Sequence, residues 1–518
     1  MAAGRTKAAA AGLAVVAVVL AIGAPVVAGA GPVPGSPAYM ARDVRNMVDA
    51  FGRDTAELTS PAYVAGLPVT VARQYVTQLR AQAADATSPA ITGGNLVPGW
   101  NAGNPDRAGW AGRRGRERLV RFTAADGALL VGHLYAPLAG ARDPYTGAVL
   151  PATMPGVVMV SGSIQASAGV YSWLAEDLAE RGYLVLLFDV QGQGQSETFP
   201  HEGPVAALPG CGSGGGADQA TPCAGVPAEQ QANFDDDAED AITFFLSTPG
   251  TPYANTAVGT RHVDGFNPWW ALFDRTPDPA SATPGRTTRL ALIGHSTGAV
   301  TASYLQGVDS RIEAAVALDK ITATPNAIED DKAELGSLPG PVTPVVPILG
   351  MQSEYGFEPQ PYWEASCSSF EPCPAAPGGG VSIPDLRQAP DPNREEATGF
   401  DTWVADGVDS MVVVPRASTH LDYTDEPPIL PASVWGQAMA SYYVQAWLAK
   451  YLQHDTTADG RLLTSSIPYL EPVGHGVWKP ITVARDAHLS FYFCSGYAFH
   501  TAGGGTAVDH DIVGDGCH

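Results

Sequence analysis

The chain carries little charge, and little of that charge is positive. Only 16% of its 518 residues are charged while 45% are hydrophobic, so a large core can form and extensive disorder is not expected. Lysine and arginine number 29 against 53 acidic residues, which gives a formal net charge of −24. Such a surface repels phosphate groups and argues against nucleic acid or an anionic membrane as a partner.

Long hydrophobic runs and internal repeats are both lacking after residue 30, so no later stretch is expected to span a bilayer. The one long run, Ala8–Gly23, follows Arg5 and Lys7 and precedes Pro25 and the small residues 28–30. This order predicts a signal peptide over residues 1–30 and therefore a secreted protein. An uncleaved membrane anchor is the alternative.

Cysteine is also scarce. The six cysteines form three pairs that are close in the sequence: Cys211 with Cys223, Cys367 with Cys373, and Cys494 with Cys517. In an exported chain we expect three disulfides that close short loops, although spacing alone does not fix the connectivity. The spacings do not match a zinc site, and we expect neither a metal nor a cofactor.

The most informative stretch is Arg289–Gly298, which reads RLALIGHSTG. Its apolar first half predicts a buried strand, and apolar residues at helical spacing follow it. Between them lies a G-x-S-x-G pentapeptide centred on Ser296, the arrangement that places a nucleophilic serine on a strained turn. The two flanking glycines are expected because a larger side chain would collide across that turn.

Strand and helix patterns alternate over most of the chain after Arg118, which predicts an α/β fold with a mostly parallel, doubly wound sheet. The predicted strands cover residues 119–122, 129–134, 157–160, 183–188, 290–293, 312–318, 345–349 and 411–414, and a long helix covers 434–452. The predicted regions are a signal peptide (1–30), a helical extension and linker (31–117), a main domain (118–455) and a disulfide-pinned extension (456–518). Insertions interrupt the main domain at 203–227, 248–288 and 357–400.

Several segments resemble secreted bacterial serine esterases of the α/β-hydrolase superfamily, in the dienelactone-hydrolase-like and polyester-hydrolase-like groups. They read SWLAEDLAERGYLVLLFDV, GHSTG, ASTHLDY and YYVQAWLAKYLQHD, and the resemblance runs from about Arg118 to Leu452. It implies an α/β-hydrolase type of sheet with cap-like insertions. The chain departs from the family at Ala299, where a second glycine is common, and at Glu354, where an aspartate is expected.

A serine hydroxyl needs a general base, and the resemblance implies the chain order serine, acid, histidine. His420 follows the last predicted strand of the main domain and is the expected base. Glu354, after the strand 345–349, is the preferred acid, and Asp319, after the strand 312–318, is the alternative. His295, beside the nucleophile in the sequence, is expected to be a packing residue.

Two backbone amides should form an oxyanion hole, those of Thr297 and Ser163, with Ile164 as the neighbouring alternative to Ser163. These residues predict a secreted serine hydrolase that cleaves carboxylic esters, small or polymeric, through an acyl-enzyme. No stable membrane insertion is expected after signal cleavage. Two alternatives stay open: a peptidase or amidase that uses the same triad, and a non-catalytic binding protein on a hydrolase scaffold.

Overall fold

The computed structural model describes residues 32–33, 36–84, 103–162, 167–191, 193–197, 231–256, 262–319, 321–323, 338–355, 399–425 and 434–513. Several sequence predictions lie outside these residues. They are the signal peptide, the insertion at 203–227, nearly all of that at 357–400, the expected oxyanion residue Ser163 and five of the six cysteines. Cys494 is described and is not a free thiol, so the three proposed pairings stay predictions.

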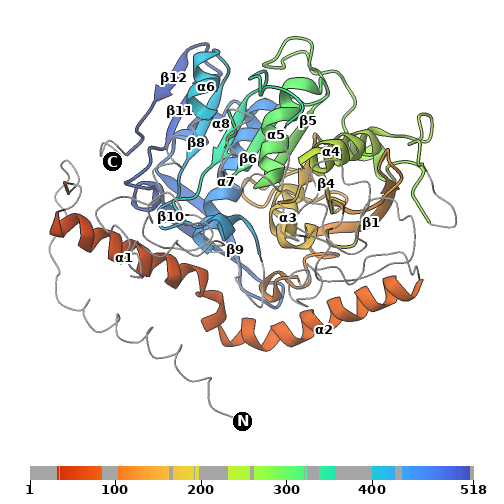
Figure 1. The fold of residues 1–518 in the computed structure, drawn as a ribbon, viewed down its shortest axis with the longest axis horizontal. Coiled ribbons are helices and arrows are strands. Elements are labelled where there is room, and N and C mark those ends of the chain that lie inside the picture. The colour runs from red at the N-terminus through yellow and green to blue at the C-terminus, as the bar shows by residue number, and fades with distance from the viewer. Residues whose placement is uncertain are drawn as a thin grey trace, which may run out of the picture.

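A ten-stranded mixed sheet forms the centre of the molecule (Figure 1). Its strands are β1 (Gly115–Thr123), β2 (Leu129–Pro137), β3 (Gly156–Val160), β4 (Leu184–Phe188), β5 (Leu290–His295), β6 (Ala314–Leu318), β7 (Ile348–Met351), β8 (Ser410–Val413), β11 (Gly496–His500) and β12 (Thr506–Asp509). Every strand predicted from the sequence is present, although β1 and β2 are longer than predicted and the ends of β6 and β7 are shifted.

The strands lie in the order β1-β2-β4-β3-β5-β6-β7-β8-β11-β12. From β4 to β8 all neighbours are parallel, while β1 and β2 at one end and β11 and β12 at the other pair antiparallel. The predicted α/β class with a mostly parallel sheet is therefore confirmed.

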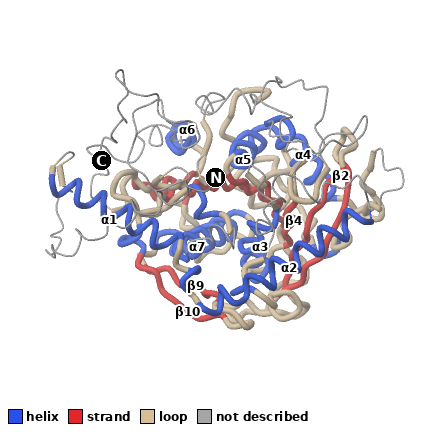
Figure 2. The backbone as a smooth tube through the Cα atoms, turned by 60° about the horizontal axis from the view of Figure 1, so that its bottom comes forward, coloured by secondary structure: helices blue, strands red, loops and turns tan. Residues whose placement is uncertain are grey.

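Helices cover both faces of this sheet (Figure 2). The described helices are α1 (Pro37–Asp54), α2 (Pro61–Ala84), α3 (Ser172–Glu180), α4 (Gln231–Leu246), α5 (Thr297–Val308), α6 (Gly399–Ala405), α7 (Val434–Tyr451) and α8 (Ala458–Leu463). One core cluster joins α3 and α7 to the sheet, and a second joins α4, α5 and α6 to the opposite face. Val157 and Val158, neighbours on β3, fall into different clusters, because successive side chains of a strand point to opposite faces.

The C-terminal segment is part of the main sheet. β11 pairs with β8, and β12 forms the edge next to it (Figure 1). The remaining strands, β9 (Ser466–Pro472) and β10 (Trp478–Ala484), form a separate antiparallel hairpin. The sequence predicted only an extension here, because the pairing partner of β11 lies more than eighty residues earlier in the chain.

The N-terminal helices α1 and α2 follow one another along one side of the molecule (Figure 1). α1 begins at an N-cap, where the Ser36 side chain accepts a hydrogen bond from the Tyr39 amide, and it buries Tyr39, Asn46 and Ala50. Tyr39 contacts Tyr492 edge-to-face at 6.1 Å between ring centroids. None of the described helices is long and apolar enough to cross a lipid bilayer.

If the C-terminal strands complete the core, truncating a buried side chain there must destabilise the whole domain. Phe499 of β11 is fully buried and packs near Trp447 of α7, with ring centroids 6.4 Å apart. We expect Phe499→Ala to lower the free energy of unfolding by about 3–5 kcal/mol. The control Val508→Ala, at a 54% exposed site on β12, should change it by less than about 0.5 kcal/mol in urea denaturation. If Phe499→Ala and Val508→Ala changed the free energy of unfolding by equally small amounts, β11 would not be part of the cooperative core.

Candidate active site

Four segments meet where the parallel strands end. Because parallel strands point the same way, the residues that follow β3, β5, β6 and β8 share one edge of the sheet. The chain runs from β3 to β4 on one side and returns with β5 on the other side of β3. As a general rule, open α/β sheets bind ligands beyond the carboxyl ends of the strands at such a reversal.

Ser296 stands at this reversal, between β5 and α5. Its backbone has φ 55° and ψ −122°, a conformation that non-glycine residues rarely adopt. A Cβ atom on Gly294 would collide with the backbone of Gly298, so the turn requires glycine. The strained serine turn predicted from the sequence is therefore present, and Ser296 is its apex.

The end of β3 approaches Ser296 closely. A Cβ atom on Gly162 would lie 3.0 Å from Cβ of Ser296 and 3.1 Å from Nδ1 of His295. Thr297, one of the two predicted oxyanion donors, is the first residue of α5, where helix amides have no partner inside the helix.

Asp319 and His420 form a hydrogen-bonded pair next to the serine turn. Oδ2 of Asp319 contacts Nδ1 of His420, and Oδ1 accepts from the Ser353 amide and hydroxyl, both at 2.7 Å. The Ser296 amide donates to the carbonyl of Leu318, the residue before Asp319, at 3.2 Å. The Asp319 side chain is 2% exposed and that of His420 12%, so the imidazole can be reached from outside while the carboxylate cannot.

The preference for Glu354 as the partner of His420 is wrong. Its carboxylate accepts from the Ala417 amide and the Ser490 hydroxyl, each at 2.6 Å, and from Nδ2 of Asn46. Burial raises the pKa of Glu354, while these donors act in the opposite direction. The carboxyl group thus lies under the loop that carries His420, while Asp319 holds the imidazole.

Sequence reasoning missed the role of α1 at this loop. Arg53 of α1 donates to the carbonyl of Arg416 and pairs with Asp422 at 3.1 Å. Asp422 in turn closes a capping box with Thr419 at the start of the short 3₁₀ helix that begins with His420. No local sequence pattern predicts these contacts, because Arg53 lies more than 360 residues before its partners.

His295 and Tyr171 form a second buried pair that the sequence did not predict. The Tyr171 hydroxyl lies 2.8 Å from Nδ1 of His295, and Nε2 of His295 lies 3.0 Å from the carbonyl oxygen of His420. Burial lowers the pKa of His295 to about 3, and the adjacent His420 imidazole adds to the effect. His295 is therefore neutral near pH 7, and it is hydrogen-bonded at both ring nitrogens rather than only packed.

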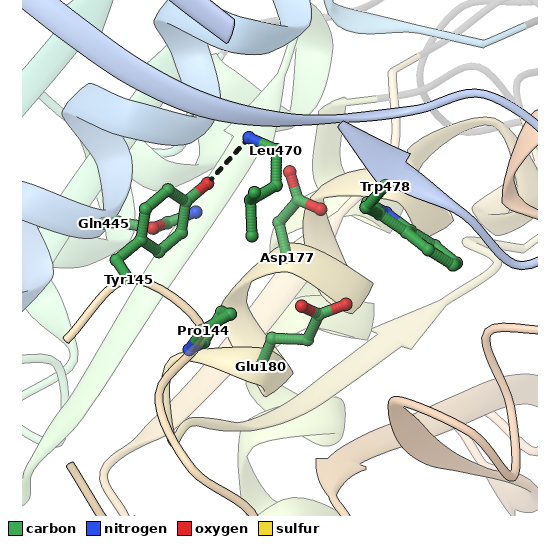
Figure 3. Close-up of a pocket in the computed structure, with 7 residues that line it drawn as sticks. All are labelled: Pro144, Tyr145, Asp177, Glu180, Gln445, Leu470 and Trp478. Carbon is green, nitrogen blue, oxygen red and sulfur yellow. Dashed lines mark hydrogen bonds between the residues drawn. The ribbon is translucent and has the colours of Figure 1, made fainter. Parts of the chain in front are cut away.

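A small cavity elsewhere is not a candidate substrate site (Figure 3). Its volume is about 10 Å³, room for one water molecule, and it is lined by Pro144, Tyr145, Asp177, Glu180, Gln445, Leu470 and Trp478. The Tyr145 hydroxyl accepts from the Leu470 amide at 3.2 Å across it. None of these residues belongs to the loops that carry Ser296, Asp319 or His420. Within the described ranges, no group of three or more His, Cys, Asp or Glu residues is placed to hold a metal ion.

Fold and site together define an α/β protein with a strained serine beside an aspartate–histidine pair. No family model matches the chain, and no curated protein matches it. Among solved structures, the chain is similar to hypothetical protein PA2218 from Pseudomonas aeruginosa, with 13% identity and a TM-score of 0.36. That alignment covers 67% of this chain and 98% of the other. A likeness this distant carries no argument, so the functional interpretation rests on the site geometry.

The buried neutral imidazole of His295 predicts a pH dependence of stability. Its folded pKa of about 3 lies below its ordinary value of 6.5, so between these values the unfolded chain binds a proton that the folded chain does not. The contribution of this pKa difference to the free energy of unfolding is fully present above about pH 6.5. It is lost as the pH falls, at up to about 1.4 kcal/mol per pH unit. Asparagine cannot titrate, so the free energy of unfolding of His295→Asn should fall less steeply with decreasing pH than that of the wild type. Urea denaturation at pH 7, 6 and 5 measures this difference. If the free energies of unfolding of the two proteins fell in parallel with pH, His295 would be protonated in the folded chain as it is in the unfolded chain.

Proposed function

We propose that this chain is a secreted serine hydrolase of the α/β-hydrolase type that cleaves carboxylic esters through an acyl-enzyme. The observation that carries the proposal is the strained Ser296 turn beside the buried Asp319–His420 pair. A serine held in this conformation costs about 1–3 kcal/mol, and such strain is concentrated at functional sites. A surface serine in an ordinary turn would need neither the strain nor the adjacent pair.

The proposed acylation uses His420 as a general base. Nε2 takes the proton of the Ser296 hydroxyl while Oγ attacks the ester carbonyl carbon, and Asp319 stabilises the imidazolium that forms. The carbonyl oxygen gains a negative charge, which the Thr297 amide, with the predicted Ser163 amide, would stabilise. The intermediate then expels the alcohol, which receives the proton from His420.

Deacylation repeats these steps with water. His420 removes a proton from the attacking water molecule, the second tetrahedral intermediate collapses, and Ser296 leaves with that proton as the carboxylic acid is released. Each partial reaction returns the imidazole to its neutral form. Asp319 stays ionised throughout and keeps the Nδ1 hydrogen of His420 in place, so that Nε2 is free to accept.

The remaining predictions belong to the same proposal. Export through a signal peptide, three disulfides and cap-like insertions are the features that we expect of a secreted ester hydrolase of this type. The proposed binding place for the ester lies beyond the carboxyl ends of β3 and β5, beside Ser296. The acidic net charge of −24 supports a substrate that carries no phosphate, whether a small molecule or a polymer. The peptidase and the non-catalytic alternatives are separated from an esterase by the following measurement.

Turnover of p-nitrophenyl esters and aminoacyl anilides by the mature chain and by Ser296→Ala tests the proposed reaction. We expect ester turnover by the wild type and a loss of roughly four to six orders of magnitude in kcat for the variant, since the covalent step is removed. Circular dichroism provides the folding control. Faster cleavage of anilides than of esters would favour a peptidase, and no turnover of either class would favour a binding protein. Normal ester turnover by folded Ser296→Ala would contradict the nucleophile assignment.

A further inference from the structure

We propose that Tyr171 and His295 form a positioning pair that holds Gly162, at the end of β3, and the His420 loop at a fixed separation beside Ser296. The proposal rests on the function proposed above and names residues that act on the site without touching the substrate. Its basis is a continuous chain of hydrogen bonds from the Gly162 amide to the His420 carbonyl.

The direction of every hydrogen bond in this chain is fixed. The His420 carbonyl oxygen can only accept, so Nε2 of His295 carries the hydrogen, and the neutral ring leaves Nδ1 as an acceptor. The Tyr171 hydroxyl therefore donates to Nδ1, and its oxygen accepts from the Gly162 amide at 2.9 Å. No link can reverse without leaving a buried polar group unpaired.

The surroundings give this chain little freedom to adjust. Tyr171 is 2% exposed and His295 3%, so an unpaired group here is not hydrated at low cost. Tyr171 ends the 3₁₀ helix Ala168–Tyr171, and the Ala168 amide donates to the Asp189 carboxylate at 2.6 Å. The adjacent Val170 carbonyl accepts from the Asp425 amide at 2.8 Å, a second link to the His420 loop.

Ser296 lies next to the pair, since it directly follows His295 in the chain. Gly162 closely approaches both Cβ of Ser296 and Nδ1 of His295, and the His295 and His420 rings lie 4.5 Å apart, centroid to centroid. Acyl transfer requires the base and the oxyanion donors to be placed correctly relative to one serine oxygen, and a shift of about 1 Å can cost about a hundredfold in rate. A neutral His295 also avoids a second positive charge next to His420 when that imidazole becomes protonated.

Two substitutions break the chain at different links. Tyr171→Phe removes the hydroxyl and both of its bonds, while His295→Asn keeps an acceptor near the Nδ1 position and removes the donor to His420. We expect each to lower kcat on a p-nitrophenyl ester by about ten- to a hundredfold with KM changed less than about threefold. In the double variant the loss should not exceed that of the worse single variant, because the two residues act as one unit.

Tyr451→Phe is the matched control. Tyr451 of α7 is also buried, and its hydroxyl donates to Asp409 at 2.8 Å. Among the described residues, its side chain contacts Trp447 and Lys450 and not the loops that carry Ser296, Asp319 or His420. This control should lower the melting temperature about as much as Tyr171→Phe and leave kcat unchanged.

A Tyr171→Phe protein with kcat within about twofold of the wild type would overturn the proposal, as would multiplicative losses in the double variant or an equal loss in Tyr451→Phe. If Tyr171→Phe does not fold, His295→Asn decides by the same criterion. A wild-type chain that turns over no ester would instead refute the proposed function, a failure that is visible before any variant is compared.

Discussion

The hydrogen bond between Asp319 and His420 joins two loops that are separated by 101 residues in the chain, and the geometry of the site depends on it. It requires the end of β6 and the end of β8 to stand at the same sheet edge, with β7 between them. It also requires unusual backbone: Ser296, Asp319 and Ala417 all have positive φ, at 55°, 60° and 58°. Strain of about 1–3 kcal/mol at each position persists because the surrounding core determines where each strand ends.

Many buried polar contacts near this pair hold the loop that carries His420. Glu354 accepts from the Ala417 amide, Arg53 donates to the Arg416 carbonyl, and His295 donates to the carbonyl of His420 itself. The α1 helix, which lies outside the predicted main domain, contributes two of the side chains involved, Asn46 and Arg53. Residues 37–54 are thus a structural part of the site, since they hold its histidine loop from the outside.

How much of this site the sequence predicts depends on how far apart in the chain the residues of each contact lie. The serine turn is encoded within Arg289–Gly298, where strand, glycines and helix are adjacent, and it was predicted correctly. His420 was found because it follows a recognisable strand. The partner of His420 was mispredicted, because Asp319 and Glu354 follow neighbouring parallel strands and only tertiary packing decides which one meets the imidazole. In the structure, Asp319 directly follows its strand at φ 60°, a conformation that aspartate tolerates better than most residues. The contacts of Asn46 and Arg53 bridge more than 300 residues and had no local signal.

The central claim is that Asp319, and not Glu354, orients His420, and kinetics of Asp319→Asn beside Glu354→Gln test it most directly. On one activated ester, Asp319→Asn should lose about ten-thousandfold in kcat, as neutralising a triad acid does. Glu354→Gln should retain kcat within about tenfold but lose about 1–3 kcal/mol of stability. The amide it introduces would face the Ser490 oxygen, which already accepts from the amides of Tyr492 and Phe493. A crippled but folded Glu354→Gln beside a nearly normal Asp319→Asn would contradict the account.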